Sequence, residues 1–251
     1  MNAELWENLG FFLTRLRGLP SCESLTLPGG FCLSTGSESA SENWAFSPGV
    51  PPDEKWAGRM LNFFDERGVP FVCPVEEDNT PRALTAAGLR ERGRLAVMTR
   101  NPEGLPEGAP DVTFHPVSSP EDTRRWAQAA WRGFDGEVPA PEAFQKLAGN
   151  MAGDTLGLRL VLAEIQGREA GTFLLALSRE AAGIYYFATV PEFRRRGVAS
   201  AMMAKAGCMA LTVGCPELVL QSTPAGLPFY RSEGFTLRGE LALFSSSEDV
   251  F

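Results

Sequence analysis

Apolar residues recur every three or four positions in several stretches of this chain, which is the spacing of an amphipathic helix. Helices are expected at 1–19, 56–68, 81–92, 120–134, 141–150, 198–213 and 225–232. Short apolar runs predict strands at 69–75, 94–100, 112–117, 158–165, 170–178, 183–190 and 218–222, with a strand pair within 235–244. Tight turns at 166–167 and 181–183 predict that three of these strands form an antiparallel meander.

The order of these elements indicates two parts. Proline and glycine are dense at 101–110, as in a linker. The stretch 20–52 is rich in serine, glycine and proline and is expected to have the least regular structure. The order helix, glycine, strand, short helix, glycine, strand occurs in both 56–100 and 198–244, either by chance or because the first half is a reduced copy of the second.

Composition narrows the class of protein. The chain has 251 residues, 44% of them hydrophobic and 22% charged, which is typical of a globular protein. It carries 31 acidic and 23 basic side chains, a net charge of −8, so we expect no nucleic-acid partner. The first 19 residues lack the order of a signal peptide and the apolar runs are too short to span a membrane. We therefore expect a cytoplasmic protein with no membrane partner.

Histidine and cysteine usage excludes several kinds of site. His115 is the only histidine, so a histidine-based triad or a site with several histidine ligands is excluded, no metal is expected, and a structural role is favoured for this residue. The five cysteines show no CxxC spacing and are expected to be reduced. Cys208 and Cys215 are expected to be thiols of the core.

The stretch 185–203 carries the clearest chemical signal. A strand ends at Val190, Pro191 prevents its pairing from continuing, and a turn with three arginines leads into a helix that begins near Gly197. Helix N-termini bind anions, and glycine lets a phosphate approach the backbone closely. A helix with an exposed basic start is the alternative, but arginine there opposes the helix dipole, so the pattern favours a phosphate site.

Residues of this stretch resemble a known signature. Arg194-x-x-Gly197-x-Ala199, directly after a strand, is similar to the acyl-CoA-binding signature of the GNAT acyltransferase superfamily. A strand at 218–221 and the segment 228–235, which is similar to the family's FYxxxGF segment, follow in the family's order. The resemblance covers 112–244. It implies an α+β fold, with a mixed and mostly antiparallel sheet flanked by helices, preceded by a smaller α/β domain.

The resemblance also implies an activity, the direct transfer of an acetyl or short acyl group from acetyl-CoA to an amine. Tyr230 is the implied catalytic residue, which protonates the departing thiolate, and the N–H of Val190 is expected to face the oxyanion. Backbone groups of Ala188 and Val190 are expected to bind the pantetheine, and amides from Arg195 to Ser200 the pyrophosphate. The residues assigned to the co-substrate are Ala188, Thr189, Val190, Arg194, Arg195, Arg196, Gly197, Val198, Ala199, Ser200, Thr223 and Phe229.

The sequence departs from the family pattern at two positions. Thr223 stands where many members have asparagine, and the strand before the signature carries Tyr185 and Tyr186 in place of an acidic residue. Glu164 and Glu192 are candidate general bases, and a base acting through water or an amine that arrives neutral are alternatives, so the base is unassigned.

Two functional hypotheses follow. The predicted domains are a degenerate GNAT-like or accessory domain at 1–109 and a catalytic domain at 110–251. The first domain lacks the signature, so we expect it to shield the substrate side or to form a homodimer interface. The acceptor is expected to be a small-molecule or peptide amine. A catalytically inactive CoA-binding or protein-interaction module is the alternative to an enzyme.

Overall fold

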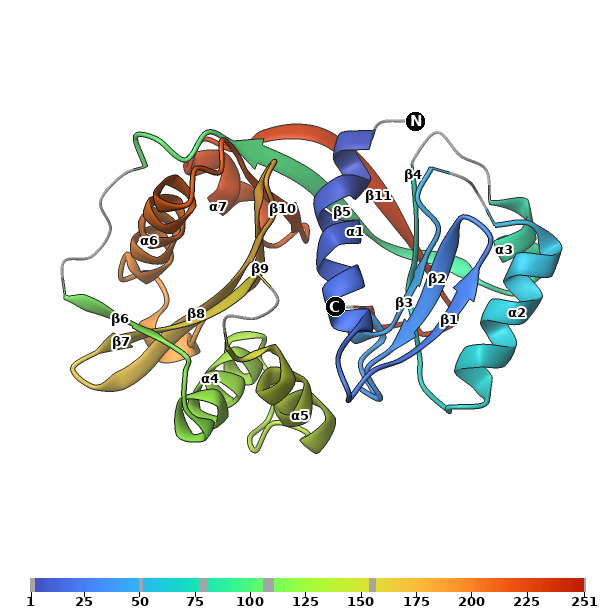
Figure 1. Ribbon diagram of the computed structural model, residues 1–251, viewed down its shortest axis with the longest axis horizontal. Coiled ribbons are helices and arrows are strands. Elements are labelled where there is room, and N and C mark those ends of the chain that lie inside the picture. Colours follow the sequence, from blue (N-terminus) through green and yellow to red (C-terminus); the bar gives the residue numbers. More distant parts are fainter. Residues whose placement is uncertain (1–2, 50–51, 77–80, 106–110, 154–156, 251) are drawn as a thin grey trace. The chain divides into compact units, whose positions relative to one another are not determined.

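The computed structural model describes residues 3–49, 52–76, 81–105, 111–153 and 157–250 (Figure 1). The chain forms two compact units. Unit 1 consists of Met1–Met98, Gln221–Pro228 and Leu237–Phe251, and unit 2 of Thr99–Leu220 and Phe229–Thr236. The C-terminal strand therefore packs in the same unit as the N-terminal residues. The functional assignments of 1–109 and 110–251 stay predictions, and 106–110 of the predicted linker lie outside the described residues.

Unit 1 combines a small antiparallel sheet with helices and longer strands. Its elements are α1 (Ala3–Arg17), β1 (Glu23–Leu27), β2 (Gly30–Ser34), η1 (Ala40–Glu42), β3 (Trp44–Phe46), α2 (Glu54–Asp65), β4 (Cys73–Glu76), α3 (Arg82–Ala86), β5 (Arg90–Arg100, which ends in unit 2) and β11 (Thr236–Ser245, which begins there). β2 pairs with β1 and β3, and β11 pairs antiparallel with β4. A parallel bridge between Trp44 and Val72 links β3 to the residue before β4.

The stretch 20–52 is more regular than the sequence indicates. The prediction of little regular structure was wrong, because β1, β2 and β3 all lie in it. The β1–β2 turn contains Pro28 and Gly29, and Gly29 has a φ of 73°. The serine-rich segment between β2 and β3 folds around Asn43, whose buried side-chain amide donates to the carbonyls of Ser37, Ser39 and Pro70.

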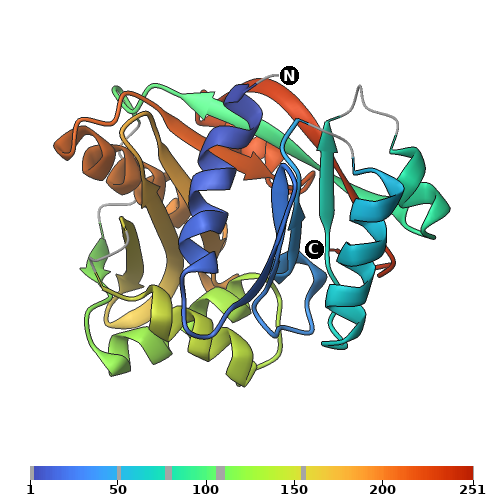
Figure 2. The ribbon, with the colours of Figure 1, turned by 45° about the vertical axis from the view of Figure 1, so that its right-hand side comes forward.

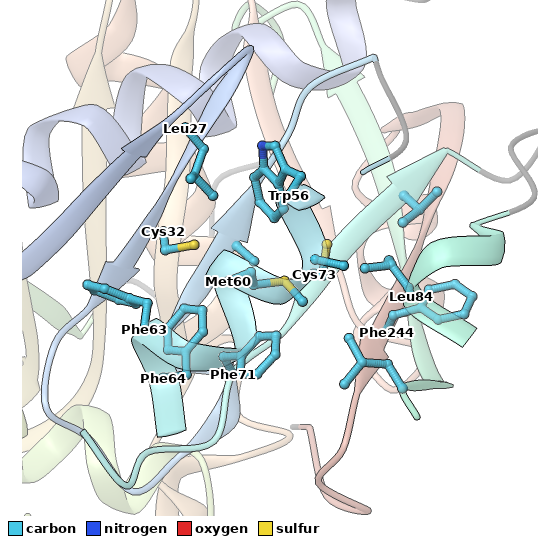
Figure 3. Packing of buried hydrophobic residues seen from close by; sticks show 14 of the residues in the cluster. Leu27, Cys32, Trp56, Met60, Phe63, Phe64, Phe71, Cys73, Leu84 and Phe244 are labelled. Atoms are coloured by element: carbon cyan, nitrogen blue, oxygen red, sulfur yellow. The ribbon is translucent and has the colours of Figure 1, made fainter. Parts of the chain in front are cut away.

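The core of unit 1 forms under α2 (Figure 3). Asp53 caps this helix by accepting a hydrogen bond from the Trp56 N–H at 2.7 Å. Met60 and Phe64 are fully buried, and the ring of Phe64 stacks on that of Phe71 with centroids 4.1 Å apart. The amphipathic spacing of 56–68 is confirmed.

Several elements differ from the sequence predictions, among them β4 and β5, which begin at Cys73 and Arg90 and not at 69 and 94. The helix expected at 81–92 is limited to α3, because Gly88 has a φ of 87° and β5 starts at Arg90. The strand pair expected within 235–244 is one strand, β11.

Unit 2 holds most of the main sheet. Its elements are β6 (Val112–Pro116), α4 (Pro120–Gly133), α5 (Glu142–Met151), β7 (Leu158–Ile165), β8 (Arg168–Leu177), β9 (Ala182–Thr189), η2 (Pro191–Phe193), α6 (Val198–Thr212), β10 (Leu218–Ser222, which ends in unit 1) and α7 (Leu227–Ser232, which begins there). The strand order is β10-β9-β8-β7-β6. Antiparallel pairing from β6 to β9 confirms the predicted meander, and β10 runs parallel to β9.

Helices lie on both faces of this sheet. Figure 1 shows α6 on one face and α4 with α5 on the other, and Figure 2 shows the same separation from a second side. Trp126 of α4 is fully buried and donates its indole N–H to the Val161 carbonyl at 3.1 Å. On α6, Met202 packs so closely on β8 that a Cβ at Gly171 would lie 2.7 Å from its sulfur.

The predicted core thiols divide into one buried and one exposed residue. Cys215 is buried and its thiol lies 3.2 Å from the Ser178 carbonyl, whereas Cys208 is exposed, which corrects its prediction. In the described ranges, no helix has both the length and the apolar character that a bilayer crossing requires. Across those same ranges, no three histidine, cysteine or acidic side chains gather closely enough to hold a metal ion.

Candidate functional site

The N-terminus of α6 is an uncapped helix start with exposed backbone. Gly197 is the N-cap residue, with a φ of 77° and no side-chain cap, and the first turn of α6 contains no acidic residue. The N–H of Ala201 donates to the Gly197 carbonyl, so the amides of the three preceding residues are the first of the helix, where no intrahelical acceptor exists. Gly197 is exposed and Arg195 has a φ of 63°, so the turn presents its backbone to solvent.

The three arginines of this turn have different surroundings. Arg194 donates to the carbonyls of Thr189 at 3.2 Å and Gly133 at 3.0 Å, and its guanidinium lies 2.9 Å from the Asp135 carboxylate. It therefore links the end of β9 to the end of α4. The guanidinium of Arg196 lies 5.2 Å from the ring centroid of Phe193. Arg195 and Arg196 are exposed beside the α6 N-terminus, where they add positive charge.

The backbone of β9 shows which residues face its neighbour β8. The Val190 N–H donates to the Ala170 carbonyl at 3.0 Å. Ala188 pairs with Thr172, and a Cβ at Gly171 would lie 2.8 Å from the Ala188 carbonyl oxygen. Bonded and non-bonded positions alternate in an antiparallel pair. Ala188 and Val190 therefore both turn their backbone groups toward β8.

Two predictions are corrected by this alternation. The Val190 N–H is engaged with β8, so its role as the oxyanion donor was wrong, and Ala188 and Val190 do not present the backbone groups expected to bind pantetheine. Thr189 lies between them and faces the opposite edge. Its carbonyl accepts the hydrogen bond from Arg194, which lies away from β8.

The edge of β9 toward which Thr189 faces is separated from β10. The two strands pair at Leu218 with Ala182 and at Val219 with Gly183, and within the described residues the ladder ends there. A bulge in β9 opposite Thr172–Leu174, where Tyr186 has a φ of 47°, adds one residue and bends the strand. The two strands therefore separate beyond this pairing, and Thr189 lies on the open side of β9.

Tyr230 lies in a group of aromatic rings. Its ring centroid is 6.0 Å from that of Phe187, 5.3 Å from that of Phe229 and 5.7 Å from that of Phe235. Burial raises the pKa of the Tyr230 phenol above its usual value of about 10. The hydroxyl is therefore a protonated hydrogen-bond donor at neutral pH, and a weaker acid than a free phenol. The structure brings α7 together with the last residues of β9.

Thr223 does not belong to the same unit as these residues. It belongs to unit 1, where the Gly226 N–H donates to its carbonyl at 3.1 Å. The other predicted site residues belong to unit 2.

Both candidate bases are paired with arginine. Glu164 is 6% exposed, its carboxylate pairs with Arg125, and its second oxygen lies 3.1 Å from His115 Nε2. The carboxylate of Glu192 pairs with Arg132. Both carboxylates are engaged in ion pairs with arginine, so the base stays unassigned.

The sequence analysis missed one residue of the site. Glu233 is 5% exposed, and its Oε1 accepts a hydrogen bond from the Ser200 hydroxyl at 2.6 Å. Ser200 belongs to the first turn of α6, so a buried carboxylate lies beside the amides that have no intrahelical acceptor. The available signal was an acidic residue inside the segment 228–235, next to the buried Phe235.

Comparisons with known proteins found acetyltransferase sequences and structures that are similar to this chain. A sequence model described as an acetyltransferase (GNAT) domain matches residues 157–237. An acetyltransferase of Photorhabdus laumondii is 35% identical over 60 residues, which are 24% of this chain and 42% of that relative. This chain therefore aligns with less than half the length of that protein.

Solved structures resemble the chain over nearly its whole length. A GCN5-related N-acetyltransferase from Kribbella flavida has a TM-score of 0.68 and 17% identity, covering 94% of this chain and 93% of that one. A tandem GNAT protein from the clavulanic acid biosynthesis pathway has a TM-score of 0.62 and 9% identity, covering 97% of this chain and 95% of that one. At these identities the likeness shows the fold, and it confirms the predicted α+β class.

Proposed function

We propose that the chain is an N-acyltransferase that moves an acetyl or short acyl group from acetyl-CoA to an amine, and the match of residues 157–237 to an acetyltransferase (GNAT) domain model supports this. The observation that carries the proposal is the α6 N-terminus, where an uncapped glycine and two exposed arginines adjoin amides without intrahelical acceptors. These residues fit the diphosphate of an acyl-CoA. The bound thioester supplies the activated acyl group.

In this proposal the protein acts chiefly by positioning the acyl carrier. The amides of the first turn of α6 hold the diphosphate, and the open edge of β9 at Thr189 binds the arm of the carrier as an added strand would. Tyr230 donates a hydrogen bond from its hydroxyl to the departing sulfur. Its raised pKa favours this bond over complete proton transfer, so the phenol stabilises developing charge.

The acceptor enters the proposal as a small-molecule or peptide amine. Because Glu164 and Glu192 are both paired with arginine, we propose that the amine attacks the thioester carbonyl in its neutral form. As the C–S bond breaks, the proton that the nitrogen loses passes through solvent to the departing CoA sulfur. The same observation favours the second candidate function, a CoA-binding or protein-interaction module without turnover. Unit 1 serves as an accessory part in both cases.

Calorimetry and a CoA-release assay test the proposal together. Acetyl-CoA is titrated into the purified full chain, and release of CoA is then followed with a panel of small amines and peptides against a reaction without amine. Binding with amine-dependent release supports the enzyme. Binding with release no faster than in the amine-free reaction supports the module, and absence of binding refutes both.

A further inference from the structure

Glu233 occupies a position that a helix selected only for stability would fill with an apolar residue. Its backbone N–H continues the helical pattern of α7 by donating to the Phe229 carbonyl at 3.0 Å. The two residues before it, Arg231 and Ser232, are exposed, whereas the Glu233 carboxylate is buried. This segment therefore places its acidic residue inward and its other polar residues outward.

The two oxygens of this carboxylate differ in their surroundings. Oε1 accepts the hydrogen bond from Ser200. Oε2 is buried and has no hydrogen-bond partner within the described part of the chain. An unpaired buried carboxylate oxygen is destabilising, and native structures keep few such groups. This acceptor therefore lies beside the first turn of α6 without a donor from the described residues.

The position of Glu233 defines the kind of donor that suits it. A diphosphate held by the α6 amides carries no proton to donate at neutral pH and repels a carboxylate. The partner of Oε2 must then be a neutral O–H or N–H group next to the anion. An acyl-CoA has such groups on both sides of its diphosphate, the hydroxyl and amides of the pantetheine arm and the hydroxyl and amino groups of the nucleotide.

The direction of α7 favours the pantetheine arm. Tyr230 lies three residues before Glu233, and residues at this spacing lie on the same side of a helix. In the proposed function Tyr230 faces the sulfur and the α6 amides hold the diphosphate. An arm that joins the two therefore passes along the side of α7 that carries both residues.

Resting on the proposed function, we propose that Glu233 is a binding residue for the acyl carrier, with Oε2 accepting a hydrogen bond from the hydroxyl or an amide N–H of the pantetheine arm. Ser200 positions the carboxylate through Oε1.

Calorimetry with two ligands tests this contact. CoA and adenosine 3′-phosphate 5′-diphosphate, which keeps the diphosphate and lacks the arm, are titrated into the full-length wild type and Glu233→Leu. The variant should bind CoA about 10- to 100-fold more weakly, as expected for loss of a hydrogen bond to a charged group. Its affinity for the nucleotide should stay within about twofold.

Two further variants separate binding from folding. Glu180→Leu removes an acidic side chain from the exposed β8–β9 turn and should leave both affinities unchanged. Glu233→Gln keeps the shape and an acceptor, so its loss of CoA affinity should be smaller than that of Glu233→Leu. The melting temperature of Glu233→Leu should equal or exceed that of the wild type, because an unpaired buried oxygen has been removed.

The outcomes distinguish this contact from the proposed function. Equal losses for CoA and the nucleotide, or a lower melting temperature with both affinities reduced, would assign Glu233 to the nucleotide side or to folding and overturn the contact. Unchanged CoA affinity in folded Glu233→Leu overturns the contact alone. A wild type that binds neither ligand refutes the proposed function and the contact with it.

Discussion

Gly197→Glu is the most direct perturbation of the proposed diphosphate site. Gly197 caps α6 with a φ of 77°, and any side chain placed there stands at the mouth formed by the first-turn amides. A carboxylate at about 4 Å from a phosphate oxygen raises the free energy of the complex by about 4 kcal/mol for each unit charge, at an effective dielectric constant of 20. The dissociation constant of CoA should therefore rise about 1,000-fold.

The same helix provides a matched control. Gly214 follows the C-terminal end of α6, has a φ of 75°, and has no other atom within 4 Å of an added Cβ. Gly214→Glu introduces the same left-handed backbone cost of about 1–2 kcal/mol and the same charge. It should be the less stable variant, because a carboxylate is unfavourable at a helix C-terminus and favourable at an N-terminus.

Calorimetric titration of CoA into both folded variants separates the effect of the local charge from that of backbone strain. Gly214→Glu should bind CoA as the wild type does, despite its lower melting temperature, whereas Gly197→Glu should show no binding in the micromolar range. Wild-type affinity in Gly197→Glu would refute the placement of the diphosphate at α6. Equal loss in both variants would mean that backbone strain, and not the local charge, had caused it.

Three further predictions concern single residues. Tyr230→Phe should keep CoA affinity within about twofold and lower the rate of amine-dependent CoA release by about 10- to 100-fold. Stopped assays at saturating acetyl-CoA measure this rate. An unchanged rate would contradict the role of Tyr230 as a hydrogen-bond donor. A thiol reagent at pH 8 should modify Cys208 rapidly in the folded protein and leave Cys73 and Cys32 unmodified. Burial raises the pKa of the Cys73 thiol and raises that of the Cys32 thiol to about 12. Peptide mapping after labelling would show any other order of modification. Asn43→Ala should lower the free energy of unfolding by about 3 kcal/mol or more in urea titration, because several buried partners lose their hydrogen bonds, and a loss under about 1 kcal/mol would contradict this.

The start of α6 at Gly197 could be predicted from the sequence because its determinants are local. A strand end, a turn with Arg194–Arg196, a glycine and a helix start lie within a few residues of each other. Their geometry depends mainly on backbone preferences, and the structure places Gly197 at the helix start as expected. The aromatic group around Tyr230 forms from segments whose apolar and aromatic residues follow a pattern as clear as that of the α6 start.

The backbone direction of β9 could not be predicted in the same way. Alternation along a strand fixes which residues face a neighbour only while the register is regular. The bulge near Tyr186 places three steps of β9, from Tyr185 to Ala188, opposite two steps of β8, from Thr172 to Leu174. An inserted residue of this kind has no reliable signal in a run of apolar and aromatic residues.

The regular structure of 20–52 depends on partners that are distant in the sequence. β1, β2 and β3 have five, five and three residues, and so small a sheet depends on packing its hydrophobic face for stability. β3 is stabilised by the bridge to Val72, and Asn43 by its bond to the Pro70 carbonyl. Composition alone therefore indicated a loop, whereas packing against the residues before β4 produces strands.

Proline substitution tests the corrected direction of β9. Thr189→Pro removes an N–H that faces the open edge, a position at which a strand tolerates proline, so the variant should fold with a melting temperature near that of the wild type. If this N–H binds the carrier arm, CoA affinity should fall about tenfold. Ala188→Pro removes an N–H that faces Thr172 of β8 and should cost about 1–3 kcal/mol of stability. The opposite pattern, in which Thr189→Pro unfolds and Ala188→Pro remains folded but loses CoA, would restore Ala188 as the residue whose backbone faces the carrier.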